Sequence, residues 1–247
     1  MEQLLSIIGP SIRRQDTNYR KSISPNQSLA VTVRSQGNWR IAKDAFWEKW
    51  NFPSCIGALN GKHVDIQAPA NSGSLFFDYK LVLMGLVDAD YWFTYIHVGD
   101  DGRASDGGIF SASLLKRGLE SKTLNVPDDE VLPGAEDLGP MPNVIVADAA
   151  FPLKTYLMRP YRGSNLNAQK QTFNYRLSRA KMVVECAFGI LHNFLSNPED
   201  DAKWLEVGRE RNLRMHRVQR EMGGRRSSEA AASVRQLFTD YFMAHPL

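Results

Sequence analysis

Two acidic residues, each set in an apolar segment, constrain the fold and chemistry of this chain more than any other feature. The apolar run VIVA at 144–147 leads directly into Asp148, which is typical of a buried strand with an acid at its carboxyl end. Open α/β sheets bind their ligands at that end of the strands. Further along, Glu185 is the single acid of an apolar helical run at 182–188. Because a glutamate in such surroundings is seldom deeply buried without a partner or a metal ion, the two acids mark a candidate site.

The composition is that of an ordinary globular protein, with 43% hydrophobic and 23% charged residues. No apolar run approaches the roughly 20 residues that a membrane-spanning helix needs, so we expect no membrane contact. The first residues do not have the pattern of a signal peptide, so we expect an intracellular protein. The two cysteines, Cys55 and Cys186, predict buried thiols and offer no disulfide framework or metal-binding pair.

Basic residues are concentrated near the carboxyl end of the chain. The net charge is only +3, but residues 203–226 hold eight Lys and Arg against three Asp and Glu. Such a local excess can contact nucleic-acid phosphates. A solvated, partly disordered arm explains it equally well.

The amino-terminal part predicts helices. Helical patterns occupy 1–34 and 41–50, with a break at 35–38 between them. The residues predicted to share the apolar side of the second helix are Ile41, Ala45, Phe46 and Trp50.

The next segments predict three strands. A strand is expected at 55–66, in which Asn60 alternates with Ile56 and Ala58 and so shares their face. Two apolar runs at 81–87 and 92–98, separated by a short turn, predict an antiparallel hairpin.

The remaining elements predict a crossover connection. A loop at 99–108 and a helix at 109–119 precede an exposed connection at 120–142. Because such a crossover returns the chain parallel to an earlier strand, we expect Asp148 beside the strand that bears Asn60. A helix at 174–191 and a short apolar helix at 234–242 complete the predicted elements.

Three acids are candidates for binding a divalent cation, which prefers oxygen ligands. Two such ions about 4 Å apart can activate a water molecule and stabilise the leaving oxygen of a phosphodiester. Each acid also has a purely structural explanation. Asp106 could cap the following helix, Asp148 could cap or pair with an arginine, and Glu185 could form an ion pair with Lys181 one turn earlier. Spacing alone leaves these alternatives open.

Seven motifs in a fixed order resemble one known family. They are CIGALNGKH at 55–63, APANSGS at 68–74, SDGGIF at 105–110, ADAAFPL at 147–153, LMRPY at 157–161, FNYRLSRA at 173–180 and VECAFG at 184–189. Together they are similar to the endonuclease domain of PIF/Harbinger-type transposases and of the nucleases derived from them. The resemblance implies a mixed α/β, ribonuclease-H-like sheet flanked by helices, with helical segments at both ends of the chain. It divides the chain into a helical remnant at 1–50, the endonuclease-like domain at 51–195 and a charged tail with a terminal helix at 196–247.

The resemblance also implies DDE-type chemistry, in which acids hold Mg²⁺ or Mn²⁺ ions that hydrolyse DNA. Asp148 and Glu185 match the second and third acids of the catalytic triad, and Asp106 matches a further metal-binding acid. The family's first acid is replaced here by Asn60. An amide offers one neutral oxygen where a carboxylate offers two oxygens and a negative charge, so we expect impaired metal binding and hydrolysis.

Relative to the family, the chain also lacks three internal segments. They are missing between Arg34 and Asn38, after Lys80, and between Ile190 and Leu191, so the chain resembles a shortened family member.

Three hypotheses follow. The chain is an active or weakly active nuclease, a catalytically inactive descendant that binds DNA or a protein, or a truncated product without a stable fold. We expect DNA as a partner, a protein partner that supplies DNA binding or nuclear import, and location in the nucleus and also the cytoplasm. The oligomeric state is not predicted.

Overall fold

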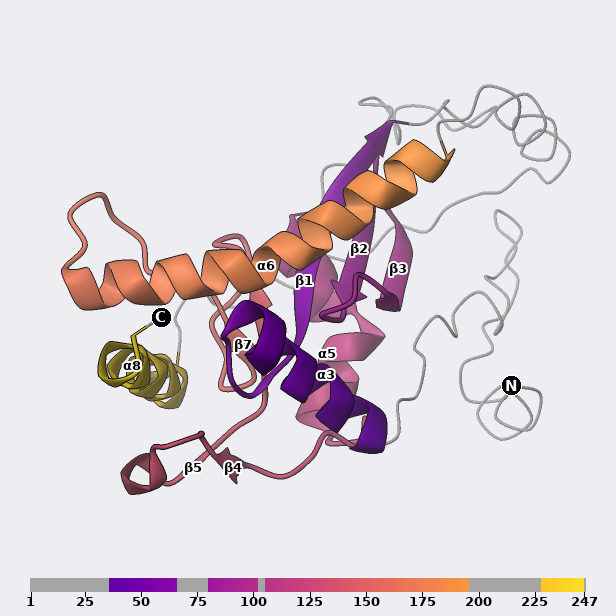
Figure 1. Ribbon diagram of the computed structural model, residues 1–247. Helices are drawn as coiled ribbons and strands as arrows, with labels where there is room; N and C mark the ends of the chain where they lie inside the picture. The colour runs from indigo at the N-terminus through magenta and orange to yellow at the C-terminus, as the bar shows by residue number, and fades with distance from the viewer. Residues whose placement is uncertain (1–35, 66–79, 102–104, 196–227, 247) are drawn as a thin grey trace, which may run out of the picture.

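A mixed sheet of five strands forms the centre of the molecule (Figure 1). The computed structural model describes residues 36–65, 80–101, 105–195 and 228–246. The strands of this sheet are β1 (Cys55–Asp65), β2 (Lys80–Val87), β3 (Phe93–Asp101), β6 (Val144–Ala147) and β7 (Leu157–Met158). Their spatial order is β3-β2-β1-β6-β7. The expected mixed α/β fold with a ribonuclease-H-like sheet flanked by helices is confirmed.

The first three strands form an antiparallel meander. The carboxylate of Asp88 closes the turn between β2 and β3, because its Oδ1 accepts hydrogen bonds from the backbone N–H groups of Asp90 and Trp92, each at 3.0 Å. The predicted hairpin is therefore confirmed. Strand β3 continues to Asp101, so the prediction of a loop from residue 99 is wrong: the backbone of Asp100 and Asp101 still pairs with β2.

Strand β6 returns parallel to β1, with Leu59 opposite Ala147. The expected position of the Asp148 strand beside the Asn60 strand is confirmed. A register shift between Cys55 and Gly57 marks a bulge at the start of β1. The extra residue places Ile56 on the opposite face from Ala58, so the prediction that Asn60 shares a face with both residues is wrong for Ile56.

Helices cover both faces of the sheet and create two apolar cores. They are α3 (Gln36–Trp50), α4 (Asp106–Ala112), α5 (Leu114–Glu120), α6 (Ala168–Leu195) and α8 (Glu229–Ala244). Figure 1 shows α6 crossing in front of the strands, with α8 below its amino-terminal half. Helices α6 and α8 pack in the first core, and α4 and α5 pack in the second.

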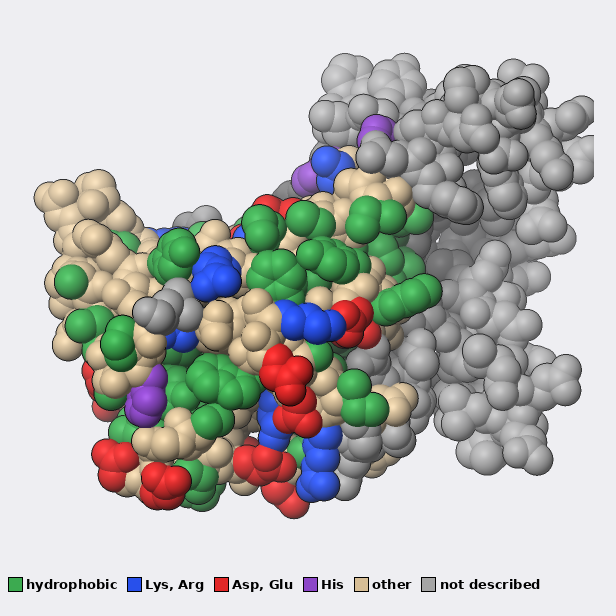
Figure 2. All heavy atoms as spheres, viewed as in Figure 1, with side chains coloured by type: hydrophobic (Ala, Val, Ile, Leu, Met, Phe, Trp, Pro, Cys, Tyr) green, Lys and Arg blue, Asp and Glu red, His purple; other side chains and the backbone are tan. Residues whose placement is uncertain are grey.

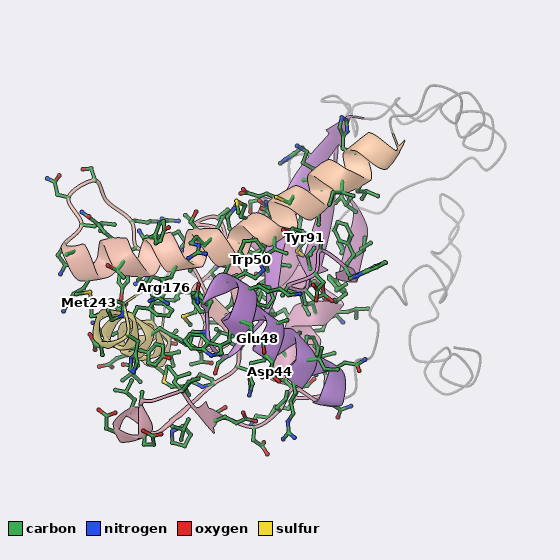
Figure 3. The ribbon with its side chains drawn as sticks, in the orientation of Figure 1. Asp44, Glu48, Trp50, Tyr91, Arg176 and Met243 are labelled. Atoms are coloured by element: carbon green, nitrogen blue, oxygen red, sulfur yellow. The ribbon has the colours of Figure 1, made fainter. Side chains whose placement is uncertain are left out.

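Helix α3 begins earlier than the pattern predicts, at Gln36, so the expected break at 35–38 is wrong from that residue onward. Its buried side consists of Trp39, Ala42 and Phe46, whereas Ile41 is 68% exposed, which corrects the predicted apolar side. The side chain of Trp39 packs in the second core, where its Nε1 donates a 2.8 Å hydrogen bond to the carbonyl of Leu124. The exposed side of α3 carries Asp44 and Glu48, as Figure 3 shows.

Residues 120–142 are more ordered than the expected exposed connection. They contain the paired strands β4 (Glu130–Val131) and β5 (Pro140–Met141), with the short helix η2 (Glu136–Leu138) between them. Leu132, Ala135 and Met141 are buried in the first core, which explains why this segment lies against the body of the protein.

Helix α8 confirms the apolar helix predicted at 234–242 and extends it in both directions. Its Phe238 and Phe242 meet Phe52 with ring centroids 5.6 and 5.1 Å apart, and Phe173 of α6 joins this group. The predicted helix at 174–191 is longer in the structure, where α6 begins at Ala168 and ends at Leu195. The boundaries predicted between the three parts of the chain stay predictions.

Several sequence features lie outside the described residues, namely the helical pattern at 1–34, the motif at 68–74 and the basic segment at 203–226. The prediction of buried thiols holds for Cys55, whose pKa is raised to about 12 by burial. It is wrong for Cys186, which follows Glu185 on the exposed side of α6. No helix in the described ranges is long and apolar enough to cross a membrane.

Candidate functional site

The pairing of β1 with β6 brings Asn60 and Asp148 to corresponding positions, each one residue beyond the pair Leu59 and Ala147. Strand β6 ends at Ala147, and Asp148 begins a turn. Its Oδ1 accepts a 2.7 Å hydrogen bond from the backbone N–H of Ala150, which holds the carboxylate at the carboxyl end of the strand. Asp148 and Asn60 are both half-buried.

Asp106 reaches the same region from the start of α4. Ser105 is the N-cap of this helix, and its Oγ accepts a 3.3 Å hydrogen bond from the backbone N–H of Gly108. The alternative that Asp106 itself caps the helix is therefore wrong. The carboxylate of Asp106 instead lies against Gly61 of β1, where an added Cβ would come within 2.2 Å of its Oδ1. Only glycine at position 61 permits this approach.

Asp106 and Asp148 form an acidic pair with an unsatisfied oxygen. The Oδ1 of Asp106 is buried without a hydrogen-bond partner. Burial raises the pKa of Asp106 above its ordinary value, the charge of Asp148 raises this pKa further, and His63 opposes the shift less strongly. A cation between these side chains would satisfy the free oxygen and relieve the repulsion.

The raised pKa of Asp106 predicts a specific pH dependence in metal-free buffer. The folded chain binds this proton more tightly than the unfolded chain, so the resulting stabilisation is present below the ordinary pKa of 3.8 and is lost as the pH rises through the raised pKa. Relative to Asp106→Asn, which does not titrate, the unchanged chain should lose stability as the pH rises above 3.8. We expect a loss of no more than about 1 kcal/mol, because Asp106 is partly exposed and its charge is screened. Urea unfolding of both proteins at each pH measures the difference, and a difference independent of pH would contradict the acidic pair.

Glu185 does not join this acidic pair. It forms an ion pair with Lys181 one turn earlier on α6, which confirms the structural alternative for this residue. The buried side of α6 includes Val184 and Phe188, and Glu185 lies beside this apolar stripe with its side chain 54% exposed. In the part of the chain that the structure describes, no three His, Cys, Asp or Glu side chains are close enough together to hold a metal ion.

Asn60 does not replace the missing charge. Its Oδ1 accepts a 3.0 Å hydrogen bond from the backbone N–H of Gly61, and this single oxygen carries no negative charge. The described residues therefore fit a divalent ion only in part. Asp106 and Asp148 offer carboxylates, whereas Asn60 beside Asp148 offers a neutral amide and Glu185 is held in an ion pair with Lys181.

A groove of about 400 Å³ lies away from these acids, where α6 meets the carboxyl end of α8. Its lining includes Tyr175, Arg176 and Met243, the last two of which are labelled in Figure 3. Tyr175 and Glu185 are ten residues apart on one helix, which corresponds to about 15 Å. The groove is therefore separate from Glu185, and neither Asp106 nor Asp148 lines it.

Sequence reasoning did not predict the roles of Gly61 and Ser105. A serine directly before a helical run is a recognisable N-cap signal, so Ser105 could have been found. The contact between Gly61 and Asp106 carries no local signal, because it joins β1 to a helix more than 40 residues later in the sequence.

Comparison with known proteins identifies the family. The family model of the DDE superfamily endonucleases matches residues 59–198, which is more than half of the chain. The chain belongs to the DDE superfamily endonucleases. It is also 29% identical over 156 residues to the Protein ALP1-like of Arabidopsis thaliana, an alignment that covers 60% of this chain and 37% of that protein. No solved structure is significantly similar to the chain.

Family membership agrees with the resemblance carried by the seven motifs, and the matched region includes Asn60, Asp106, Asp148 and Glu185. DDE superfamily endonucleases usually use divalent metal ions. The chain spans 37% of the length of the curated relative that it matches, so that protein's complete activity is not transferred to it. The metal-binding and catalytic roles of the four residues stay predictions.

Proposed function

We propose that the chain is a transposase-derived DNA endonuclease of the PIF/Harbinger type in which phosphodiester hydrolysis is impaired. One observation carries the proposal: only Asp106 and Asp148 of the expected acids come together, while the position of the first acid holds Asn60, whose oxygen accepts the N–H of Gly61. Family membership supports the class of reaction and of substrate.

The proposed impairment follows from charge. In a complete site, divalent ions activate a water molecule and stabilise the leaving oxygen of the phosphodiester. In this chain Asn60 supplies a neutral amide, and Lys181 neutralises the carboxylate of Glu185. Two of the charges that would hold Mg²⁺ or Mn²⁺ are thus absent or compensated. We expect weak metal binding and a low rate of hydrolysis.

DNA is the proposed partner, and the nucleus, with the cytoplasm in addition, is the proposed location. A protein partner could supply further DNA binding or nuclear import. Exposed acids at Asp44, Glu48, Glu136 and Asp137 would repel phosphates. Figure 2 shows acidic side chains over α3 and the connection that holds β4 and β5, with Lys and Arg side chains among them over α3. We therefore expect DNA to approach a different face of the molecule.

The second candidate is a catalytically inactive module that binds DNA or a protein through the same fold. The ion pair between Glu185 and Lys181 favours it, because a carboxylate held by a lysine is less available to a metal ion. The two candidates differ in whether any cleavage depends on Asp148.

Cleavage of duplex DNA in Mg²⁺ or Mn²⁺, compared between the unchanged chain and Asp148→Ala, tests the proposal. We expect the unchanged chain to exceed the variant by no more than about tenfold, because the missing charge at Asn60 already lowers the rate of the unchanged chain by about 10² to 10³. Equal rates with intact DNA binding would favour the inactive module. A rate about 1000-fold above the variant would contradict the proposed impairment.

A further inference from the structure

Four basic side chains surround Tyr161 in the segment between β7 and α6. The guanidinium of Arg235 on α8 lies 3.8 Å from the centroid of the Tyr161 ring, and the Nζ of Lys170 on α6 lies 5.3 Å from it. Arg159 and Arg162 flank Tyr161 in the sequence. We call Arg159, Arg162, Lys170 and Arg235 the Tyr161 cation cluster.

The Tyr161 cation cluster has no acidic partner within the described ranges, because none of its members forms an ion pair with a carboxylate there. The arginines donate instead to backbone carbonyls. The pairs are Arg159 Nη1 to Phe151 at 2.9 Å, Arg162 Nη2 to Ala149 at 2.7 Å and Arg235 Nη1 to Pro160 at 3.5 Å. These bonds orient the guanidinium groups, and no carboxylate in the described ranges forms an ion pair that would offset their positive charges.

The arginines retain unused donors and repel one another. The Nε atoms of Arg159 and Arg235 are buried without a hydrogen-bond partner. Burial lowers the pKa of Arg159, and the charges of Arg162 and Arg235 lower it further. Holding like charges this close costs free energy that a bound anion would offset.

The Tyr161 cation cluster adjoins the acidic pair. The carbonyls of Ala149 and Phe151, which accept from Arg162 and Arg159, belong to the turn that begins with Asp148. The same turn therefore carries the carboxylate of Asp148 and accepts hydrogen bonds from both arginines. Arg162 is exposed, so its side chain is accessible to a ligand in solution.

We propose that the Tyr161 cation cluster binds the phosphodiester backbone of duplex DNA beside the Asp148 turn. The planar fork of a guanidinium matches the oxygens of a phosphate, and lysine adds a point charge. Such contacts position the nucleic acid without reading its sequence. The choice of DNA as the polyanion rests on the proposed function.

The variant Arg162→Ala and the matched control Arg117→Ala test this assignment. Both arginines are exposed and each donates one hydrogen bond to a backbone carbonyl, that of Ala112 at 3.2 Å in the control. Arg117 lies on α5, which packs in the other core. Binding of a fluorescent duplex is measured by anisotropy at several salt concentrations, with EDTA present so that no cleavage occurs.

We expect Arg162→Ala to weaken binding about three- to tenfold at 0.1 M salt and to reduce the slope of log K against log salt by about one. The double variant Arg162→Ala/Lys170→Ala should reduce the slope by about two, whereas Arg162→Lys and Arg117→Ala should keep it. Equal thermal melting of all variants excludes unfolding. If Arg162→Ala melts at a lower temperature than the unchanged chain, the salt slope of Lys170→Ala is compared with that of Arg162→Lys instead.

The proposal would be overturned by an unchanged slope in the double variant, by an equal loss in Arg117→Ala, or by no binding of duplex DNA by the unchanged chain. Displacement of DNA by poly-glutamate at equal charge concentration would show a preference for any polyanion and would overturn the assignment to phosphodiesters. The binding measurement does not depend on cleavage, because EDTA removes the metal ions that cleavage needs. A chain that does not cleave DNA would therefore still support the cluster if Arg162→Ala reduced the salt dependence of binding as expected.

Discussion

Asn60→Asp combined with Lys181→Met should raise metal-dependent cleavage of duplex DNA about 100-fold over the unchanged chain. The aspartate restores a charged ligand on β1, one residue beyond the Leu59 and Ala147 pair. The second substitution frees Glu185 from its ion pair, and methionine keeps most of the volume of the largely buried Lys181 side chain. Each single variant should gain about tenfold, because each corrects one of two charge defects. The initial rate of plasmid nicking in Mn²⁺ measures the gain.

The control for this gain is the same double variant with Asp148→Ala, which should return cleavage to background. A gain that survives Asp148→Ala would come from a contaminating nuclease. A double variant no faster than the unchanged chain, with the same thermal melting, would mean that Asn60 and Lys181 do not limit the reaction.

Arg176→Met should lower the free energy of unfolding by about 3 kcal/mol. Arg176 is only 2% exposed and lies on α6. It donates a 3.0 Å hydrogen bond from Nη1 to the carbonyl of Asn51 after α3, and a second bond from Nη2 to the carbonyl of His245 after α8. Its guanidinium also lies 4.9 Å from the centroid of the Phe242 ring. The substitution keeps apolar volume but leaves two carbonyls without their charged donor, and urea unfolding measures the loss.

Arg179→Met is the matched control for this prediction. Arg179 lies almost one turn further along α6, and its guanidinium is 5.9 Å from the centroid of the Tyr175 ring. It should cost no more than about 0.5 kcal/mol, since its contact is partly exposed. Equal losses in the two variants would show that the bonds from Arg176 to the ends of α3 and α8 do not hold these helices together.

The strands and the order of the sheet could be predicted because their signals are local. Apolar runs ending in turn residues predicted β2, β3 and β6, and the crossover rule placed β6 beside β1. The bulge that moves Ile56 to the other face could not be predicted, because it depends on the register with β6. Likewise the apolar pattern of α8 was visible, but its packing on Phe52 depends on a residue almost 190 positions earlier.

The site shows the same limit. The candidate acids and the ion pair of Glu185 with Lys181 could be named from residue type and helical spacing. The separation of Glu185 from Asp106 and Asp148 could not, because it depends on how α6 lies across the sheet. The Tyr161 cation cluster was not predicted at all, since Arg235 joins Arg159 and Arg162 only through the packing of α8.

Calorimetric titration of Mn²⁺ into the unchanged chain and into Asn60→Asp tests most directly whether the first ligand position limits the site. We predict that Asn60→Asp binds Mn²⁺ at least about tenfold more tightly, and that adding Asp106→Asn removes this gain. Equal affinities of the unchanged chain and Asn60→Asp, or a gain that does not depend on Asp106, would contradict a metal site formed around Asn60, Asp106 and Asp148.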